Sequence, residues 1–162
     1  MINASALPKS TASINWQCQR LPALDPLALL RIMRARQQVF VVEQNCVYLD
    51  ADLADEQAWH LAGWLPDGQL AAYARIVDPG VKYAEPSIGR VISSLSLRGS
   101  GLGREVVRRT IDHAALAYPA SPLRISAQSH LQAFYGSFGF AAVGEPYLED
   151  GIPHQEMLRS GD

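Results

Sequence analysis

The sequence predicts a mixed α/β fold, in which helices pack on one β-sheet. Short apolar runs with strand periodicity recur along the chain, and two longer segments carry apolar residues at helical spacing. The third observation is size, because 162 residues, of which 48% are hydrophobic, suffice for one core and leave no room for a second domain. We therefore expect one domain over residues 14–160, preceded by a flexible segment over residues 1–13.

The first predicted elements are a strand and a helix. Residues 14–18 alternate between apolar and polar side chains, which is typical of a half-buried strand. Asp25 is a suitable N-cap and Pro26 suits the first helical position, and helical spacing of apolar residues continues to about Phe40.

A hairpin and a fourth strand follow. Residues 59–65 and 70–77 are apolar runs, and residues 66–69 (Pro-Asp-Gly-Gln) between them contain an Asp-Gly pair that favours a tight antiparallel turn. Residues 87–93 predict the fourth strand. Gly89 within it indicates a β-bulge or the close approach of another backbone.

The carboxyl-terminal part predicts three more strands and a short helix. Residues 123–127 form the fifth strand, and Ser129 is a candidate cap of a short helix that Gly139 closes in the left-handed conformation. Residues 141–143 and 153–158 predict the last two strands.

The loop of residues 98–103 (Arg-Gly-Ser-Gly-Leu-Gly) precedes a helix over residues 105–117 and is the strongest functional feature of the sequence. Gly101 and Gly103 leave room for backbone N–H groups to approach an anion, and the helix adds the positive end of its dipole. The loop lacks the G-x-G-x-x-G pattern of Rossmann folds and the G-x-x-x-x-G-K-[ST] pattern of P-loops. Taken alone, it fits a phosphate site and an ordinary glycine turn equally well.

The spacing Arg98-x-x-Gly101-x-Gly103 is similar to the R/Q-x-x-G-x-G/A signature of the GCN5-related N-acetyltransferases (GNATs). The predicted order of elements also resembles this superfamily from Ile14 to Leu158, which is nearly the whole chain. Four runs look like its bacterial ElaA-like branch: residues 36–52 (RQQVFVVEQNCVYLDAD), 73–76 (YARI), 88–91 (IGRV) and 149–154 (EDGIPH).

The resemblance implies an acyl-CoA N-acyltransferase fold, whose largely antiparallel sheet splays open between the fourth and fifth strands. Acetyl-CoA would lie in that opening as the acyl donor. Its pantetheine arm would pair with the backbone of Val91, Ile92 and Ser93. Its pyrophosphate would meet the amides of the glycine loop, which comprises Arg98, Gly99, Ser100, Gly101, Leu102, Gly103 and Arg104.

Residues 130–140 (HLQAFYGSFGF) resemble the second cofactor motif of the superfamily, in which a tyrosine on the short helix reaches the thioester sulfur. Tyr135 matches that position. Spacing alone favours a core aromatic that packs with Leu131, Phe134 and Phe138. The resemblance instead favours a role for the Tyr135 hydroxyl at the sulfur.

Acetyl transfer also needs a base, because an alkylammonium with a pKa of about 10.4 is almost wholly protonated at pH 7. Glu43, His60 and His154 are the candidates, acting directly or through a water molecule. For each of them the residue type alone favours a structural role: a solvated loop carboxylate, a satisfied strand histidine or a hydrogen-bonded turn residue. We rank Glu43 first, because it lies in the most branch-specific run.

Residues 41–58 lose periodicity and carry five acidic residues, which are Glu43 and the group Asp50, Asp52, Asp55 and Glu56. Such a group is more often a solvated loop than an attractor for a cationic amine. Arg36 and Arg75 differ, because a helix face and a strand interior would bury their charges at a cost of several kcal/mol if they were unpaired. We expect them to pair with the acidic residues and shape the pocket.

Composition argues against several classes of protein. The formal net charge of -2 and the pI of about 6.1 give no general attraction to nucleic acid or to an anionic membrane. Cys18 and Cys46 make neither a disulfide framework nor a metal motif, so we expect reduced cysteines, no metal and a cytoplasmic location. No signal peptide or long apolar run contradicts that location.

The leading hypothesis is direct transfer of the acetyl group of acetyl-CoA to a primary amine of a small molecule or peptide. Two alternatives stay open. One is a CoA-binding sensing module without turnover, and the other is an enzyme like the acyl-homoserine lactone synthases, which share an Arg-x-x-Val-Phe run with residues 36–40. The oligomeric state is open too, and a homodimer is compatible with the sequence.

Overall fold

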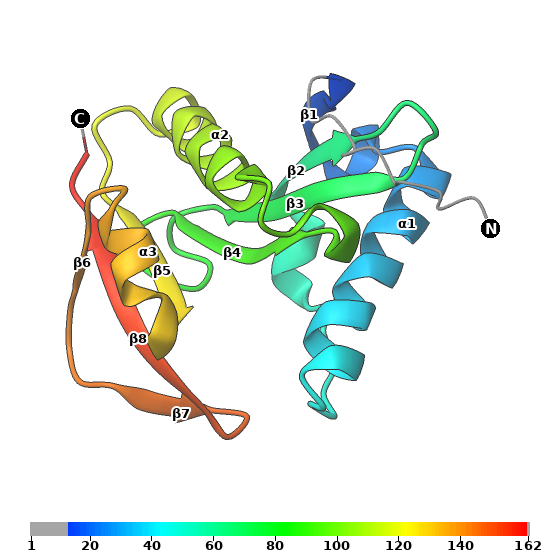
Figure 1. Cartoon of the computed structure of the whole chain (residues 1–162). Coiled ribbons are helices and arrows are strands. Elements are labelled where there is room, and N and C mark those ends of the chain that lie inside the picture. Colours follow the sequence, from blue (N-terminus) through cyan, green and yellow to red (C-terminus); the bar gives the residue numbers. More distant parts are fainter. Residues whose placement is uncertain (1–12, 162) are drawn as a thin grey trace.

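The computed structural model describes residues 13–161, and they form an eight-stranded mixed sheet with helices packed on it (Figure 1). The strands are β1 (Asn15–Arg20), β2 (Trp59–Trp64), β3 (Leu70–Val77), β4 (Ser87–Ser93), β5 (Leu123–Gln128), β6 (Phe140–Ala142), β7 (Tyr147–Glu149) and β8 (Ile152–Arg159). The helices are α1 (Pro26–Arg36), α2 (Leu102–Ala117) and α3 (Gln132–Gly136). The expected mixed α/β fold class is confirmed. The flexible segment expected over residues 1–13 falls almost wholly outside the described residues.

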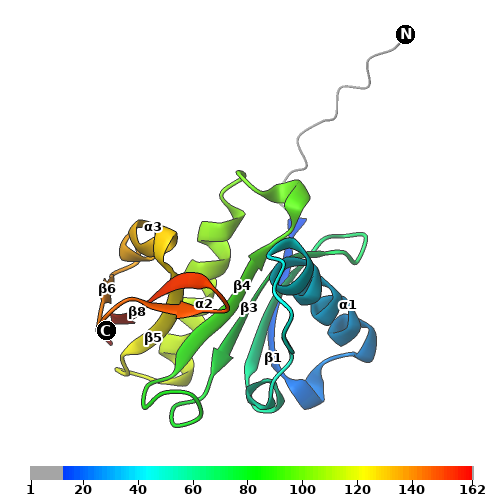
Figure 2. The same ribbon diagram turned by 90° about the horizontal axis from the view of Figure 1, so that it is seen from below.

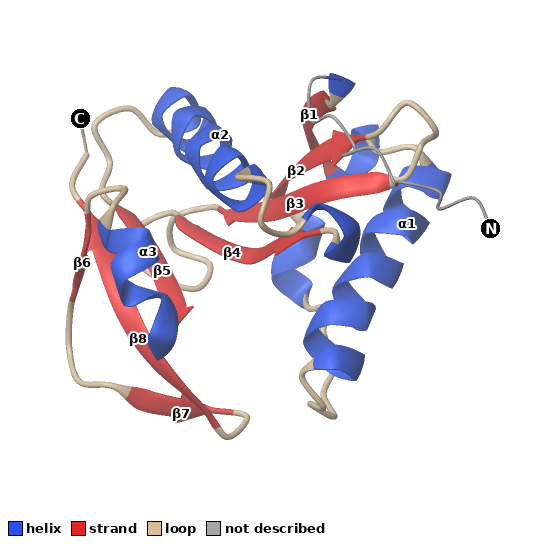
Figure 3. Cartoon of the chain, viewed as in Figure 1, coloured by secondary structure: helices blue, strands red, loops and turns tan. Residues whose placement is uncertain are grey.

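The strand order is β1-β2-β3-β4-β5-β8-β6, with β7 also paired to β8. Helices α1 and α2 lie on opposite faces of the β1–β4 half, as Figures 1 and 2 show. Neighbouring residues of β2 point to opposite faces, so Leu61 packs in the cluster that contains α2 whereas Ala62 packs with Ile32 of α1. Helix α3 lies on the β5–β8–β6 half (Figure 3).

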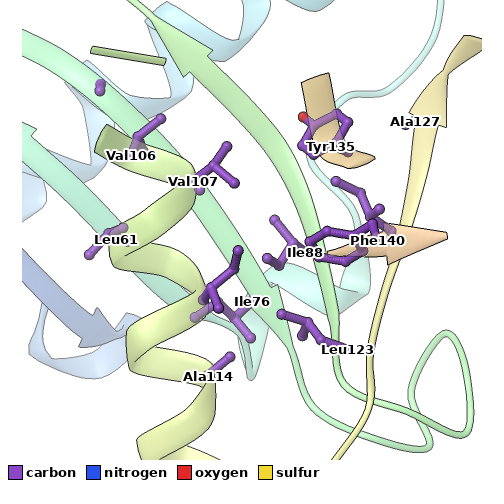
Figure 4. Close-up of a cluster of buried hydrophobic side chains, with 14 of the residues drawn as sticks. Leu61, Ile76, Ile88, Val106, Val107, Ala114, Leu123, Ala127, Tyr135 and Phe140 are labelled. Carbon is purple, nitrogen blue, oxygen red and sulfur yellow. The ribbon is translucent and has the colours of Figure 1, made fainter. Parts of the chain in front are cut away.

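The larger core cluster joins the two halves of the sheet (Figure 4). Val106 and Val107 of α2 pack toward Ile88 of β4, while Tyr135 of α3 and Phe140 of β6 approach from the other half. Burial of these apolar side chains therefore fixes α2 and α3 relative to β4.

Sheet pairing confirms the predicted hairpin and the predicted irregularity in β4. Strands β2 and β3 pair antiparallel, and Gly68 has the positive φ of 80° that the turn requires. In β4, Gly89 pairs with Arg75 and Ile92 pairs with Tyr73, so two residues of β4 oppose one of β3. This is a β-bulge, and its left-handed residue is Arg90, with φ of 55°.

Strands β4 and β5 begin side by side and then separate. They pair in parallel only at Ser87 with Arg124 and at Ile88 with Ile125. From Gly89 onward the described residues give β4 no partner on its β5 side. The expected splay between the fourth and fifth strands is thus confirmed.

Three expected details were wrong. The helical segment does not end near Phe40, because α1 is followed by π-helical turns over Gln37–Glu43. Ser129 makes no capping hydrogen bond with any described residue, and its buried hydroxyl has no partner among them. The end of the chain holds three strands, since β7 adds a short exposed strand against β8. In the described part of the chain, no helix is long and apolar enough to cross a membrane.

Candidate functional site

A cavity of about 430 Å³ opens where β4 and β5 separate. Its walls come from the segment after α1, the β3–β4 loop, β4, β5, α3 and the β7–β8 hairpin. Three of the predicted site residues line it: Val91, Tyr135 and His154. The other lining residues are Val39, Phe40, Gln44, Cys46, Tyr48, Leu49, Asp52, Lys82, Tyr83, Ser87, Ile88, Arg90, Ser126, Ala127, Gln128, Leu131, Glu149, Asp150 and Ile152.

The predicted pantetheine strand presents one free backbone edge. The antiparallel ladder to β3 satisfies the opposite edge, where Ile92 pairs with Tyr73 and Ser93 with Ala72. Because β5 has already turned away, the segment from Val91 to Ser93 can accept an extended ligand as an added strand.

The glycine loop forms the amino-terminal end of α2, a helix of 16 residues. Gly99 and Gly101 have φ of 81° and 87°, and Gly101 is the N-cap. No described side chain caps the helix, so its first N–H groups point out from the helix end without an intrahelical partner. A Cβ atom at Gly99, Gly101 or Gly103 would meet no described atom within 4 Å, so the loop is open to an approaching anion.

Two arginines connect this loop to its surroundings. Arg104 donates a hydrogen bond to the Ser137 hydroxyl at 3.0 Å, and its guanidinium lies 4.6 Å from the centre of the Phe138 ring. Arg104 therefore ties the start of α2 to the segment that follows α3. Arg98 instead binds both carboxylate oxygens of Glu43, at 2.6 and 3.1 Å.

That contact places Glu43 beside the glycine loop, outside the lining of the cavity. The hydrogen bond from Arg98 lowers the pKa of the Glu43 carboxyl. A carboxylate held in its charged form by a guanidinium is a weaker base. The first-ranked base is therefore paired with Arg98 and is not among the residues that line the cavity with Tyr135.

The two histidine candidates lie in different environments. His60 is buried on β2, where Nδ1 accepts from the Tyr73 hydroxyl at 2.7 Å and Nε2 donates to the Asp55 carbonyl oxygen at 2.9 Å. Burial lowers the pKa of His60, so it is a neutral structural residue. His154 lines the cavity, and its Nδ1–H donates to the Ile152 carbonyl oxygen at 2.7 Å.

That hydrogen bond leaves Nε2 of His154 as the nitrogen that can take a proton. The Glu149 carboxylate lies 3.4 Å from this nitrogen. The Tyr147 ring stacks on the imidazole, with 6.0 Å between ring centroids.

Tyr135 belongs both to the core and to the cavity wall. Its ring packs edge-to-face on Phe134 at 5.0 Å and on Phe140 at 6.1 Å between centroids. Figure 4 shows its hydroxyl oxygen directed away from Phe140. Burial raises the pKa of Tyr135 to about 12, so the phenol is protonated and can donate a hydrogen bond at neutral pH.

The acidic segment is a buried ion-pair network rather than a solvated loop, so the expectation of solvation was wrong for Asp50 and Asp55. The expected pairing of Arg36 and Arg75 is confirmed. The contacts are Arg36 to Asp50 at 2.7 Å and to Asp55 at 2.6 Å, Arg75 to Asp55 at 2.8 Å and to Asp52 at 2.6 Å, and Arg90 to Asp50 at 2.7 Å. The positive charges of three arginines thus balance the negative charges of three aspartates in this network. Glu56 is exposed, as expected of a loop.

Sequence reasoning missed several lining residues, among them Lys82, Tyr48 and Gln128. They come from separate loops and strand ends, and no spacing rule connects them. The charged bulge residue Arg90 could have been found, because the arginine directly follows the glycine that predicted the irregularity. The described residues contain no group of three or more His, Cys, Asp or Glu placed to hold a metal ion.

Residues 34–160 match the family model described as an acetyltransferase (GNAT) domain. A UPF0039 protein of Synechocystis sp. is 49% identical over 90% of this chain and 94% of its own length. The structure of an acyl-CoA N-acyltransferase from Pseudomonas aeruginosa is 44% identical, with a TM-score of 0.86 over 91% of this chain and 100% of that one. Escherichia coli ElaA is 42% identical, with a TM-score of 0.85 over 91% and 99%.

Proposed function

Because the chain belongs to the GNAT acetyltransferase family, in the branch that includes ElaA, we propose that it transfers an acetyl group from acetyl-CoA directly to a primary amine of a small molecule or peptide. The observation that carries this proposal is that three features occur together around the opening between β4 and β5. They are the free edge of β4, the open amino-terminal end of α2 and a cavity that holds Tyr135 and His154.

In the proposed complex, the loop amides from Arg98 to Arg104 bind the pyrophosphate, and the arm pairs with Val91, Ile92 and Ser93. The thioester then lies at the bulge, beside Tyr135. The acceptor enters through the cavity, and its nitrogen attacks the carbonyl carbon while the Tyr135 hydroxyl donates a hydrogen bond to the departing sulfur.

We assign the base to His154 in preference to Glu43. The support is geometric, since His154 shares the cavity with Tyr135 and its Nε2 faces the Glu149 carboxylate at 3.4 Å. Glu43 is instead proposed to position Arg98 at the pyrophosphate loop. The retained tyrosine and histidine also argue against a sensing module, and the glycine loop argues against a lactone synthase.

The direct test is a screen of amines, amino acids, polyamines and peptides with acetyl-CoA, followed by free thiol. We expect thiol release that depends on the acceptor and a matching acetylated product. Thiol release without any acetylated product across the panel would contradict the proposal, as would binding of acetyl-CoA without turnover.

Acetyl-CoA should raise the melting temperature. A ligand that binds only the native state adds about 2.7 kcal/mol at a hundred times its Kd, which corresponds to roughly 5–10 °C for a domain of this size. Dephospho-CoA should act nearly as well, and pantetheine far less, because pantetheine lacks the pyrophosphate. Equal shifts from pantetheine and acetyl-CoA would exclude the loop as the main binding element.

Gly101→Val should weaken acetyl-CoA binding by roughly tenfold or more, because a branched side chain at φ of 87° strains the loop and blocks the anion. A binding titration beside a circular dichroism melt measures both effects. Gly144→Val is the matched control, since Gly144 has φ of 70° and open space for a Cβ. Equal affinity in the two variants would remove the loop from the site.

His154→Gln should lower the rate by roughly tenfold at about pH 7–8, where most of the acceptor amine is still protonated and a base matters most. Acetyl-CoA affinity should not change. Glu43→Gln is the comparison, and it should keep the wild-type pH profile while weakening acetyl-CoA binding by less than about fivefold, since Arg98 and Glu43 form an exposed pair. The reverse pattern would restore Glu43 as the base.

A further inference from the structure

The cavity contains a primary amine that belongs to the chain itself. Lys82 lines it from the β3–β4 loop. The Gly80 N–H donates to the Tyr83 carbonyl oxygen at 2.7 Å, so this loop closes around Lys82 and holds it at the turn. Lys82 is the sole lysine in the described part of the chain, and Lys9 is the other lysine of the sequence.

Charged groups on several elements act on the Lys82 ammonium. They are Arg75 of β3, Arg90 of β4, Asp52 of the acidic segment and Glu149 of β7. Partial burial lowers the pKa of Lys82, and Arg75 and Arg90 lower it further, whereas the two carboxylates oppose the change. A larger fraction of Lys82 is therefore the neutral amine, which is the nucleophilic form.

Lys82 also shares the cavity with Arg90 and Val91 of the β4 bulge, where the thioester is proposed to lie. Arg90, which acts on its charge, is the bulge residue directly before Val91. Tyr135 and His154 line the same cavity. The residue as a whole is exposed, so its flexible side chain can move within the opening.

We propose that Lys82 is an acetyl acceptor, which the enzyme modifies when no free amine occupies the cavity. The inference rests on the proposed function. The Lys82 Nζ attacks the thioester carbonyl carbon, an N–C bond forms and the C–S bond breaks. A proton from nitrogen ends on sulfur, so the products are an acetylated Lys82 and free CoA. No further reactant is needed.

Acetylation would remove the positive charge of Lys82 and add its acetyl group to the cavity wall. The Glu149 carboxylate of β7 would then lose its attraction to the Lys82 ammonium. Free amines would compete with Lys82 for the acetyl group only while Lys82 is unmodified.

The test is to incubate the full chain with acetyl-CoA alone and to follow acetylation of each lysine by peptide mass mapping. Lys82 should gain one acetyl group at least about a hundredfold faster than Lys9, the other lysine of the sequence. The rate constant should not depend on protein concentration. Lys82→Arg should remove this modification, and Tyr135→Phe should slow it.

Equal rates at Lys82 and Lys9 would overturn the inference, and so would a rate at Lys82 that Tyr135→Phe leaves unchanged. A rate that rises with protein concentration would also overturn it, because a second copy would then present the lysine. Turnover of added amines with an unmodified Lys82 would refute this inference and leave the proposed function standing. Absence of acetyl-CoA binding in a melting assay would refute both.

Discussion

Tyr135→Phe should slow acetyl transfer by about 10²–10⁴-fold, which is the usual contribution of a positioned acid. The ring stays, so its edge-to-face packing on Phe134 and Phe140 and the affinity for acetyl-CoA should change little. Single-turnover kinetics beside an acetyl-CoA titration would separate the chemical step from binding.

The size of the effect follows from the acidity of the two groups. The Tyr135 pKa of about 12 lies well above the value of about 8.5 for an alkyl thiol, so full proton transfer to the thiolate is uphill by roughly 5 kcal/mol. We therefore expect a hydrogen bond that strengthens as charge develops on sulfur, with the proton arriving later from water or from the acceptor nitrogen.

Tyr118→Phe is the matched control for this prediction. The substitution removes a hydroxyl that donates to Asp78, and Tyr118 does not line the cavity. The Tyr118→Phe variant should therefore keep wild-type turnover. If Tyr135→Phe also kept wild-type turnover in the chemical step, Tyr135 would be a core aromatic and the thiolate would leave without its help.

Asp55→Asn should reduce the free energy of unfolding by roughly 3–5 kcal/mol, as is usual when one partner of a buried ion pair is removed. One oxygen of Asp55 accepts from both Arg36 at 2.6 Å and Arg75 at 2.8 Å. The side chain of Arg36 is 0% exposed and that of Arg75 is 1% exposed, so water cannot replace the lost carboxylate. Urea denaturation measures the loss.

The lowered pKa of the Asp55 carboxyl predicts how the free energy of unfolding depends on pH. Burial opposes the charged form of Asp55, but the hydrogen bond from Arg36 and the charges of Arg75 and Arg36 outweigh it and hold the pKa well below its usual value. The carboxylate therefore stabilises the fold fully above pH 4, near the unfolded pKa of about 3.9, and this contribution is lost as the pH falls toward the lower folded pKa. In Asp55→Asn, unfolding free energy should depend less on pH in this acid range.

Asp112→Asn is the control for a surface pair. Asp112 binds Arg108 on the outer face of α2, where both side chains are more than half exposed. Its removal should change the unfolding free energy by no more than the error of the measurement. A similar effect from the two variants would mean that the buried network adds no more than an exposed pair.

The network also affects the site, because it anchors the segment that carries five cavity residues: Gln44, Cys46, Tyr48, Leu49 and Asp52. Tyr48 donates to Asp50 at 3.0 Å, and Arg75 binds Asp52. A disturbed network should therefore also change the KM for the acceptor.

Local patterns in the sequence determined the fold class and the glycine loop. The period of apolar residues reports which face of each strand or helix is buried, and this predicted β2, β3, β4 and α2. Turn chemistry is local as well, so the Asp-Gly hairpin turn could be assigned. The bulge in β4 was indicated by Gly89, although the left-handed residue is Arg90.

The tertiary structure decided the partners of the charged residues. An aspartate in an aperiodic segment has the same local sequence pattern whether water surrounds its carboxylate or a guanidinium pairs with it. The sequence therefore favoured a solvated loop for Asp50 and Asp55. Arg75 and Asp55 are 20 positions apart, and folding alone brings them within 2.8 Å. Glu43 and Arg98 are 55 positions apart, and their contact moved the first-ranked base away from the cavity. Lys82 is the clearest case, because only the closure of the β3–β4 loop against β4 and the β7–β8 hairpin brings a loop lysine into the cavity with Tyr135.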